Sequence, residues 1–288
     1  MKRALILVWL VLGVLPRSIV AQAQGQDELE ANPGRPTVST PATLTPTGYL
    51  QFETGFLAAG HSPEFSSRYS FTEVVKLSLT SRIELLASAE PIVHFTAEGT
   101  TANRVADIFL GAQGVLYHGK GAKPTLAGSY FHRVYDGGAP EFDFGSPTNS
   151  SLVLASADVK GFHYDAIAFF TELEQGPGAQ FGQSLTISRP FMHRFTLSGE
   201  IWHFTQPFLR NNAVGNLWAV SYAARKTLVF DVGFNGGLTG TSTQWEVFAG
   251  FTYLLPNRLW SRDAVSNTDS LALAKNIDIL LAKANSNI

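Results

Sequence analysis

Polarity alternates along LVFDVGFN, the stretch that occupies residues 228–235. Leu228, Phe230, Val232 and Phe234 fall on one side, and an Asp, a Gly and an Asn fall on the other. Successive side chains of a β-strand point to opposite faces. The stretch therefore predicts a strand with one apolar and one polar face.

The same period of two runs from Gly48 to Leu255, and it is clearest in residues 50–56, 83–90 and 162–170. Stretches near ten residues match a tilted strand that crosses a membrane. Division at the turn residues predicts twelve strands, at about 48–58, 68–80, 83–94, 104–117, 124–135, 150–159, 162–173, 179–188, 194–204, 215–225, 227–235 and 243–254.

The expected connections alternate in length. They are short after the second, sixth, eighth and tenth strands, and longer after the first, third, fifth, ninth and eleventh. The links 118–123 and 174–178 fit this alternation less well, and 95–103 and 205–214 are among the long ones. Tight turns at one end and long loops at the other are typical of outer-membrane barrels. An even number of strands also places both chain ends on the periplasmic side.

Composition favours a barrel in lipid over a soluble sandwich. Hydrophobic residues make up 45% of the 288 residues and charged residues 15%. A sandwich would show many Lys and Glu on its water-facing sides, whereas the polar faces here carry Gly, Ser, Thr and few acids. We therefore expect an all-β, transmembrane, antiparallel up-and-down β-barrel of about twelve strands. Aromatic residues expected at its interfacial girdles are Tyr49, Tyr117, Tyr135, Trp202, Trp218, Trp245 and Tyr253.

The two ends of the chain predict export and a tail. Lys2 and Arg3 precede the apolar run 4–15, and Ala21-Gln22-Ala23 offers a cleavage site, as in a secretory signal peptide. A short helix is expected from near Asp269. It either packs into the barrel mouth or binds a partner, or it has no role beyond solvation. The expected organisation is a signal peptide at 1–23, a flexible periplasmic lead-in at 24–47, the barrel at 48–255 and a periplasmic tail at 256–288.

Charged residues on the polar faces are expected to line the lumen. Acids outnumber bases there, and acidic linings favour cations in a narrow pore. A conducting pore should thus prefer cations or neutral solutes. In the alternative, opposite charges pair and plug the lumen, since twelve strands enclose a narrow interior. The residues are Glu53, Lys76, Glu84, Glu90, Asp107, Arg133, Asp165, Glu200, Asp231 and Glu246.

Motifs for chemistry are weak in this sequence. Its seven histidines lack zinc-site spacing, and no G-x-S-x-G elbow occurs. A hydrolase would need a Ser–His pair across strands, for instance His163 with a Ser on a neighbouring strand. The net charge of −2 gives no basic field for nucleic acid. We expect no enzyme activity, no cofactor, no metal site and no nucleic-acid partner. Phe142 and Phe144, in an outer loop, could fold inward as a constriction or pack under the loop.

Three segments resemble a known family. Residues 45–55, 79–85 and 227–255 resemble the outer-membrane proteins grouped as the MetA-pathway of phenol degradation family, often labelled transporters. The resemblance implies a barrel associated with uptake of small compounds, aromatic ones among them. It brings no catalytic residues.

The expected partners follow from this assignment. They are outer-membrane lipid, a small solute, and the barrel-assembly machinery, whose C-terminal signal Gly250, Tyr253 and Leu255 resemble. The oligomeric state stays open. The sequence thus predicts a porin-like channel in the outer membrane of a Gram-negative-type bacterium. The alternatives are a structural or adhesive barrel with a plugged lumen, and an outer-membrane hydrolase.

Overall fold

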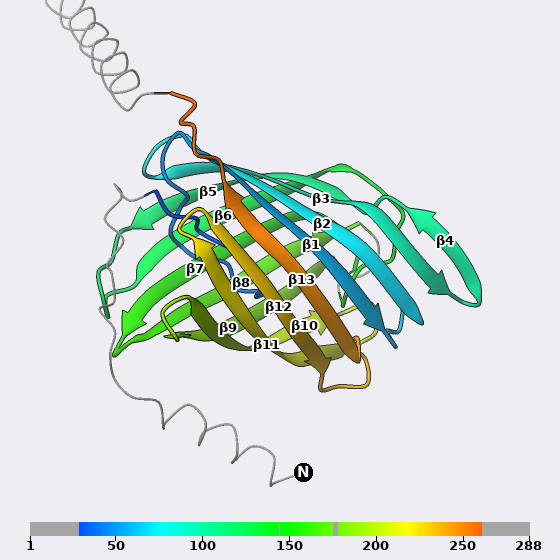
Figure 1. The fold of residues 1–288 in the computed structure, drawn as a ribbon. Coiled ribbons are helices and arrows are strands. Elements are labelled where there is room, and N and C mark those ends of the chain that lie inside the picture. Colours follow the sequence, from blue (N-terminus) through cyan, green and yellow to red (C-terminus); the bar gives the residue numbers. More distant parts are fainter. Residues whose placement is uncertain (1–28, 144, 175–177, 261–288) are drawn as a thin grey trace, which may run out of the picture.

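The computed structural model describes residues 29–143, 145–174 and 178–260, and these form a closed antiparallel β-barrel (Figure 1). No helix among them is long and apolar enough to cross a bilayer. The strands are β1 (Leu50–Gly60), β2 (Ser67–Ser78), β3 (Ile83–Ala97), β4 (Thr100–Arg104), β5 (Ile108–Tyr117), β6 (Thr125–Tyr135), β7 (Pro147–Val159), β8 (Phe162–Leu173), β9 (Ala179–Phe191), β10 (Phe195–Gln206), β11 (Asn211–Arg225), β12 (Leu228–Gly237) and β13 (Trp245–Leu254).

The barrel wall has twelve positions. β4 and β5 both pair with β3, at its two ends, and so they share one position in the wall. The remaining strands pair in sequence order, and the pairing of β1 with β13 closes the ring (Figure 1). The prediction of a twelve-stranded antiparallel barrel is confirmed.

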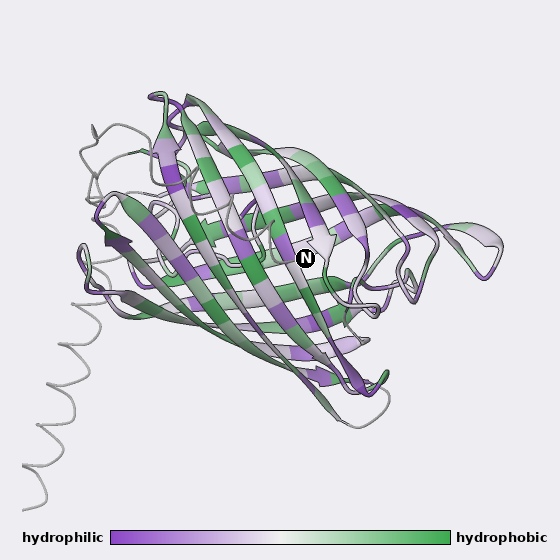
Figure 2. Cartoon of the chain, turned by 90° about the horizontal axis from the view of Figure 1, so that it is seen from below, coloured by the Kyte–Doolittle hydropathy of each residue, from purple (hydrophilic) through white to green (hydrophobic). Residues whose placement is uncertain are grey.

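The outer surface of the wall is apolar. Phe230, Val232 and Phe234 are 44%, 57% and 45% exposed, whereas Asp231 and Asn235, which alternate with them along the strand, are buried. This distribution is the reverse of that in a soluble protein, where large apolar side chains are mostly buried away from water. Green and purple stripes alternate along the strands in Figure 2 as a result. A wall of this kind suits contact with hydrocarbon on its outside.

The two rims of the barrel differ. At the turn end, where β1 begins and β13 ends, the connections are short except for residues 118–124; that between β7 and β8 is Lys160-Gly161, with φ of 51° and 81°. Two positive φ values are typical of the type I′ hairpin turn. The other rim, the loop end, carries the longest connection, residues 136–146. Two links predicted as long loops, 95–103 and 205–214, are mostly strand, because their hairpins continue pairing beyond the expected ends.

Residues 29–47 differ from the expected flexible lead-in. They lie inside the barrel as an irregular strand-free segment, drawn in blue in Figure 1. Wall side chains hold this segment by hydrogen bonds. The predicted signal peptide at 1–23, the helix near Asp269 and Phe144 lie outside the described residues.

Candidate functional site

The lumen is occupied by residues 29–47, here called the luminal segment. Pro33, Pro36, Pro41 and Pro46 prevent it from forming a regular strand, because proline has no backbone N–H to donate to a ladder. The remaining N–H groups still need acceptors once they leave water. The wall supplies these acceptors mainly as carboxylates and hydroxyls.

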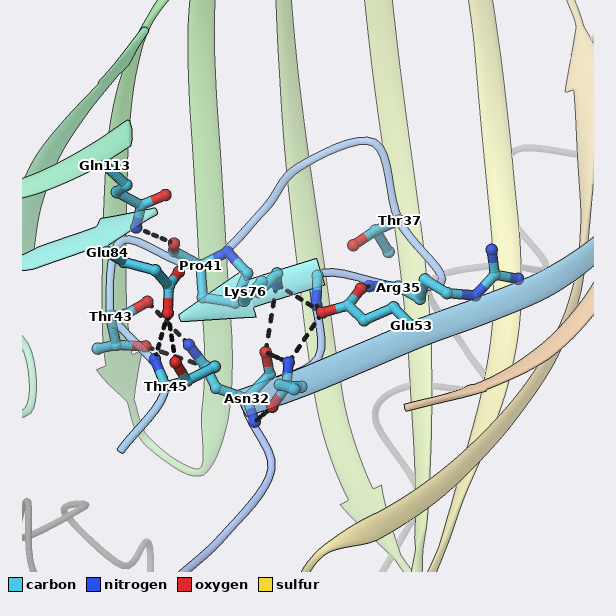
Figure 3. Close-up of polar contacts among 12 residues, drawn as sticks. Asn32, Arg35, Thr37, Pro41, Thr43, Thr45, Glu53, Lys76, Glu84 and Gln113 are labelled. Carbon is cyan, nitrogen blue, oxygen red and sulfur yellow. Dashed lines mark hydrogen bonds and ion pairs between the residues drawn. The ribbon is translucent and has the colours of Figure 1, made fainter. Parts of the chain in front are cut away.

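Glu53 on β1 binds the start of the luminal segment. Its carboxylate accepts hydrogen bonds from the backbone N–H of Gly34 at 2.9 Å and of Arg35 at 3.1 Å. Lys76 Nζ lies 2.5 Å from the same carboxylate and also reaches the carbonyl of Asn32 (Figure 3). Glu53 and Lys76 are both buried. A charge pair that also bonds the backbone holds its partner more strongly than neutral groups would.

Glu200 on β10 clamps the middle of the luminal segment. Its two carboxylate oxygens accept from the backbone N–H groups of Val38 and Ser39, each at 2.7 Å. The hydroxyls of Ser39 and Ser184 lie 2.6 Å apart. Ser39 is fully buried.

Two further acids hold the end of the segment. Glu84 accepts from both the N–H, at 2.9 Å, and the hydroxyl of Thr45 (Figure 3). Ala42 N–H donates to Ser156 Oγ at 2.7 Å, and that hydroxyl donates to Asp165 at 2.5 Å. Asp165 therefore acts on the segment through Ser156. The luminal acids that the sequence singled out are thus engaged by the chain itself.

Arg35 makes the contact with Asp231 on β12. Its NH2 lies 3.1 Å from Oδ1, its Nε lies 3.3 Å from Oδ2, and its NH1 donates to Thr72 Oγ1 at 3.0 Å. The guanidinium thus crosses from β12 to β2 inside the barrel.

One side of the lumen is apolar, a feature that the sequence analysis did not predict. Trp202 is 2% exposed, stacks on Phe204 at 4.7 Å, and donates from Nε1 to Asn235. Phe169 joins them, and Ala42 of the luminal segment packs in the same cluster. The expectation that Trp202 lies in an interfacial girdle is wrong: it shares the parity of Glu200 and so faces inward. The even spacing between Glu200 and Trp202 is the feature of the sequence that indicates the inward direction of this side chain.

The other predicted lumen residues gather near the loop end. Arg133 NH1 lies 3.1 Å from Asp107, which also accepts from Gly137 N–H at 2.9 Å. Arg68 NH2 lies 2.9 Å from Glu90, and Asn235 donates to Glu246 at 2.8 Å. Opposite charges thus pair here, away from the luminal segment.

Residues 136–143 of the long loop fold into the loop end. The Phe142 ring lies 5.4 Å from that of Phe65 and 4.0 Å from Arg68 Cζ, so it packs inward. Asp143 accepts from Thr243 N–H at 2.8 Å. Burial raises the pKa of Asp143 to about 6. Burial, with nearby acids, raises the pKa of Glu141 to about 8 and that of Glu64 to about 7.

The hydrolase arrangement is not formed in the described residues. His163 Nδ1 lies 2.8 Å from Asp158 and Nε2 lies 3.1 Å from Asp165, so carboxylates take both ring nitrogens. The Ser156 hydroxyl bonds Asp165 instead of His163. A nucleophile needs a base within hydrogen-bond reach, and His163 is directed elsewhere.

A cavity remains beside the luminal segment. Its volume is about 750 Å³, and it lies at the turn end between the segment and the wall. Arg35, Asp165, His118, Lys120 and Arg194 are among its lining residues.

The fold and the lined lumen define a twelve-stranded β-barrel of the transmembrane, outer-membrane type. No protein-family model matches the sequence, and no curated protein does. The structure is similar to that of the COG4313 outer membrane channel from Pseudomonas putida F1, with a TM-score of 0.55 and 11% identity over 74% of this chain and 98% of that one. It is also similar to the KdgM porin, with a TM-score of 0.51 and 10% identity over 70% and 98% of the two chains. At these identities the likeness is one of fold.

Proposed function

We propose that this chain is an outer-membrane channel for small solutes, and that passage requires the luminal segment to move. One observation carries the proposal: the segment fills the lumen without pairing as a strand. Side chains such as Glu53, Glu84 and Glu200 hold it, and the wall ladder is complete without it. The barrel can therefore keep its structure while its filling changes place.

The proposed location in the cell follows from the N-terminal sequence and from the outer surface of the barrel. The signal peptide predicted at 1–23 directs export, and the apolar outer wall suits a bilayer. The similar folds are a porin and an outer membrane channel by name. Together these support the outer membrane of a Gram-negative-type bacterium.

The solute class we infer includes aromatic or hydrophobic compounds. Trp202, Phe204 and Phe169 form an apolar strip on the inner face of the wall. Such a strip can stack against aromatic rings. The resemblance of residues 45–55 and 227–255 to the phenol-degradation family supports the same class, and we propose membership of that family.

A planar-bilayer recording tests the proposal. The mature protein is compared with a variant that lacks residues 29–47, after both have been shown to fold by their heat-sensitive mobility on gels. We expect brief or small openings in the first and large, steady openings in the second. A folded deletion variant that passes no current would overturn the channel assignment.

The plugged structural or adhesive barrel is the second candidate. The number and shortness of the contacts to the segment favour it, since Glu200 alone accepts two bonds of 2.7 Å. The recording separates the two candidates, because a structural barrel would stay closed in the native chain under all voltages and solutes.

A further inference from the structure

Four residues on neighbouring strands form one row across the inner wall. Gly55 pairs with Thr72 on one side and with Gly250 on the other, and Gly250 pairs with Asp231. Directly paired residues of antiparallel strands lie side by side on one face. The row therefore runs hydroxyl, glycine, glycine, carboxylate, and we call it the glycine cradle.

The guanidinium of Arg35 lies flat in the glycine cradle. It reaches Asp231 at one end, at 3.1 and 3.3 Å, and Thr72 at the other, at 3.0 Å. A Cβ at Gly55 would lie 2.4 Å from Arg35 Cζ, and a Cβ at Gly250 would lie 2.8 Å from Arg35 Nε. Any side chain at either glycine would therefore displace the planar group. The two glycines therefore leave room for a flat cation in contact with the backbone.

The cradle is buried but can be reached. The Arg35 side chain is 16% exposed and that of Asp231 is 3% exposed. Arg35 also lines the cavity of about 750 Å³ that opens at the turn end. When Arg35 leaves, a buried carboxylate loses its partner, which is costly unless another cation replaces it. The empty cradle should therefore attract a cation of the same shape.

We propose that the glycine cradle is a binding subsite for solutes that carry a guanidinium or amidinium group, with Arg35 as its tethered occupant. The planar fork of such a group can bond Asp231 through two N–H groups and Thr72 through a third. A compact ammonium group cannot match this arrangement. For transported solutes the inference rests on the proposed function, since the luminal segment must first move.

Calorimetry in detergent tests the subsite without any need for conduction. Arg35→Ala empties the cradle, and argininamide and lysinamide are titrated into the folded variant. We expect argininamide to bind at least about tenfold more tightly than lysinamide, because of the extra charge-assisted bonds. Adding Asp231→Asn should abolish this preference. Glu98→Gln, at an exposed position on the link between β3 and β4, is the matched control and should leave it unchanged.

A barrel that lacks residues 29–47 provides a second reading if Arg35→Ala does not fold. Equal affinity for the two amides in either background, or a preference that survives Asp231→Asn, would overturn the subsite. Argininamide binding without measurable current would instead count against the channel and keep the subsite. Measurable current without argininamide binding would support the channel and count against the subsite.

Discussion

The carboxylate of Glu200 on β10 accepts a hydrogen bond of 2.7 Å from the backbone N–H of Ser39, inside the barrel. The neighbouring N–H of Val38 donates to the same carboxylate. In a β-strand, backbone N–H groups of this kind would donate to the carbonyls of a neighbouring strand. The prolines of the luminal segment prevent such strand pairing. Carboxylate side chains of the wall act as the acceptors instead. The luminal segment can therefore separate from the wall without breaking the strand ladder.

Replacement of Glu200 by Gln should loosen the luminal segment. The amide keeps one acceptor oxygen, so one of the two N–H bonds is lost. A bond to a charged group contributes about 1.5–3 kcal/mol. We expect the open fraction in single-channel recordings to rise about tenfold or more. Glu98→Gln removes a charge at an exposed site and should not change it; an equal effect of both variants would show that the clamp is unimportant.

Removal of residues 29–47 should also strengthen cation preference. Glu53, Glu84 and Glu200 would then face the open lumen without their backbone partners. Rings of acid attract cations and repel anions in a narrow pore. The reversal potential in a salt gradient measures this. We expect a cation-selective deletion variant, and an anion preference would contradict the assignment of these acids to the conducting path.

Gly182→Ala should destabilise the apolar side of the lumen. A Cβ at Gly182 would lie 2.0 Å from Phe169 Cζ and 2.7 Å from Phe204 Cδ1. Overpacking of this kind costs about 1–3 kcal/mol. Gly128→Ala is the matched control, because its Cβ would meet nothing nearer than 3.7 Å. Urea unfolding followed by tryptophan fluorescence should show a lower midpoint for Gly182→Ala alone, and coincident midpoints would refute the predicted clash.

The inward packing of residues 136–143 should weaken as pH rises. Burial raises the pKa of Glu141 to about 8 and that of Asp143 to about 6, above their ordinary values of 4.5 and 3.8. An acid whose pKa is higher in the packed state than in the unpacked state stabilises the packed state. This stabilisation is complete at a pH below the ordinary pKa, and it is lost as the pH rises through the raised pKa. Amide exchange in residues 137–143, corrected for its intrinsic pH dependence, should therefore show less protection at about pH 9 than at about pH 5.

Glu141→Gln supplies the control for the pH experiment. The amide cannot ionise, so the part of the pH dependence that lies near pH 8 should disappear. The charged groups that act on Glu141 include Asp107, Glu90, Arg68 and Glu64, and they remain in this variant. If Glu141→Gln kept the full pH dependence, the titrating group would lie elsewhere.

The wall could be predicted from the sequence because its determinants are local. In β12, Phe230 and Asp231 alternate as the two faces of a strand do, and the scarcity of charge on the polar faces places the apolar face in lipid. Glu53, Glu84 and Glu200 follow from the same parity. The girdle prediction for Trp202 was wrong because it followed the position of this residue near a strand end and not its parity. Residues 95–103 are mostly strand although a loop was predicted, because polar hairpin tips show no apolar alternation.

The sequence by itself determined the period of two, the number of wall strands and the face on which each side chain lies. The tertiary structure alone decided what fills the barrel. Arg35 and Asp231 are separated by 196 positions in the chain, and the luminal segment has no periodicity of its own to place it. Its hydrogen bonds exist only after the ring has closed, because only closure brings the inner faces of distant strands around one common space.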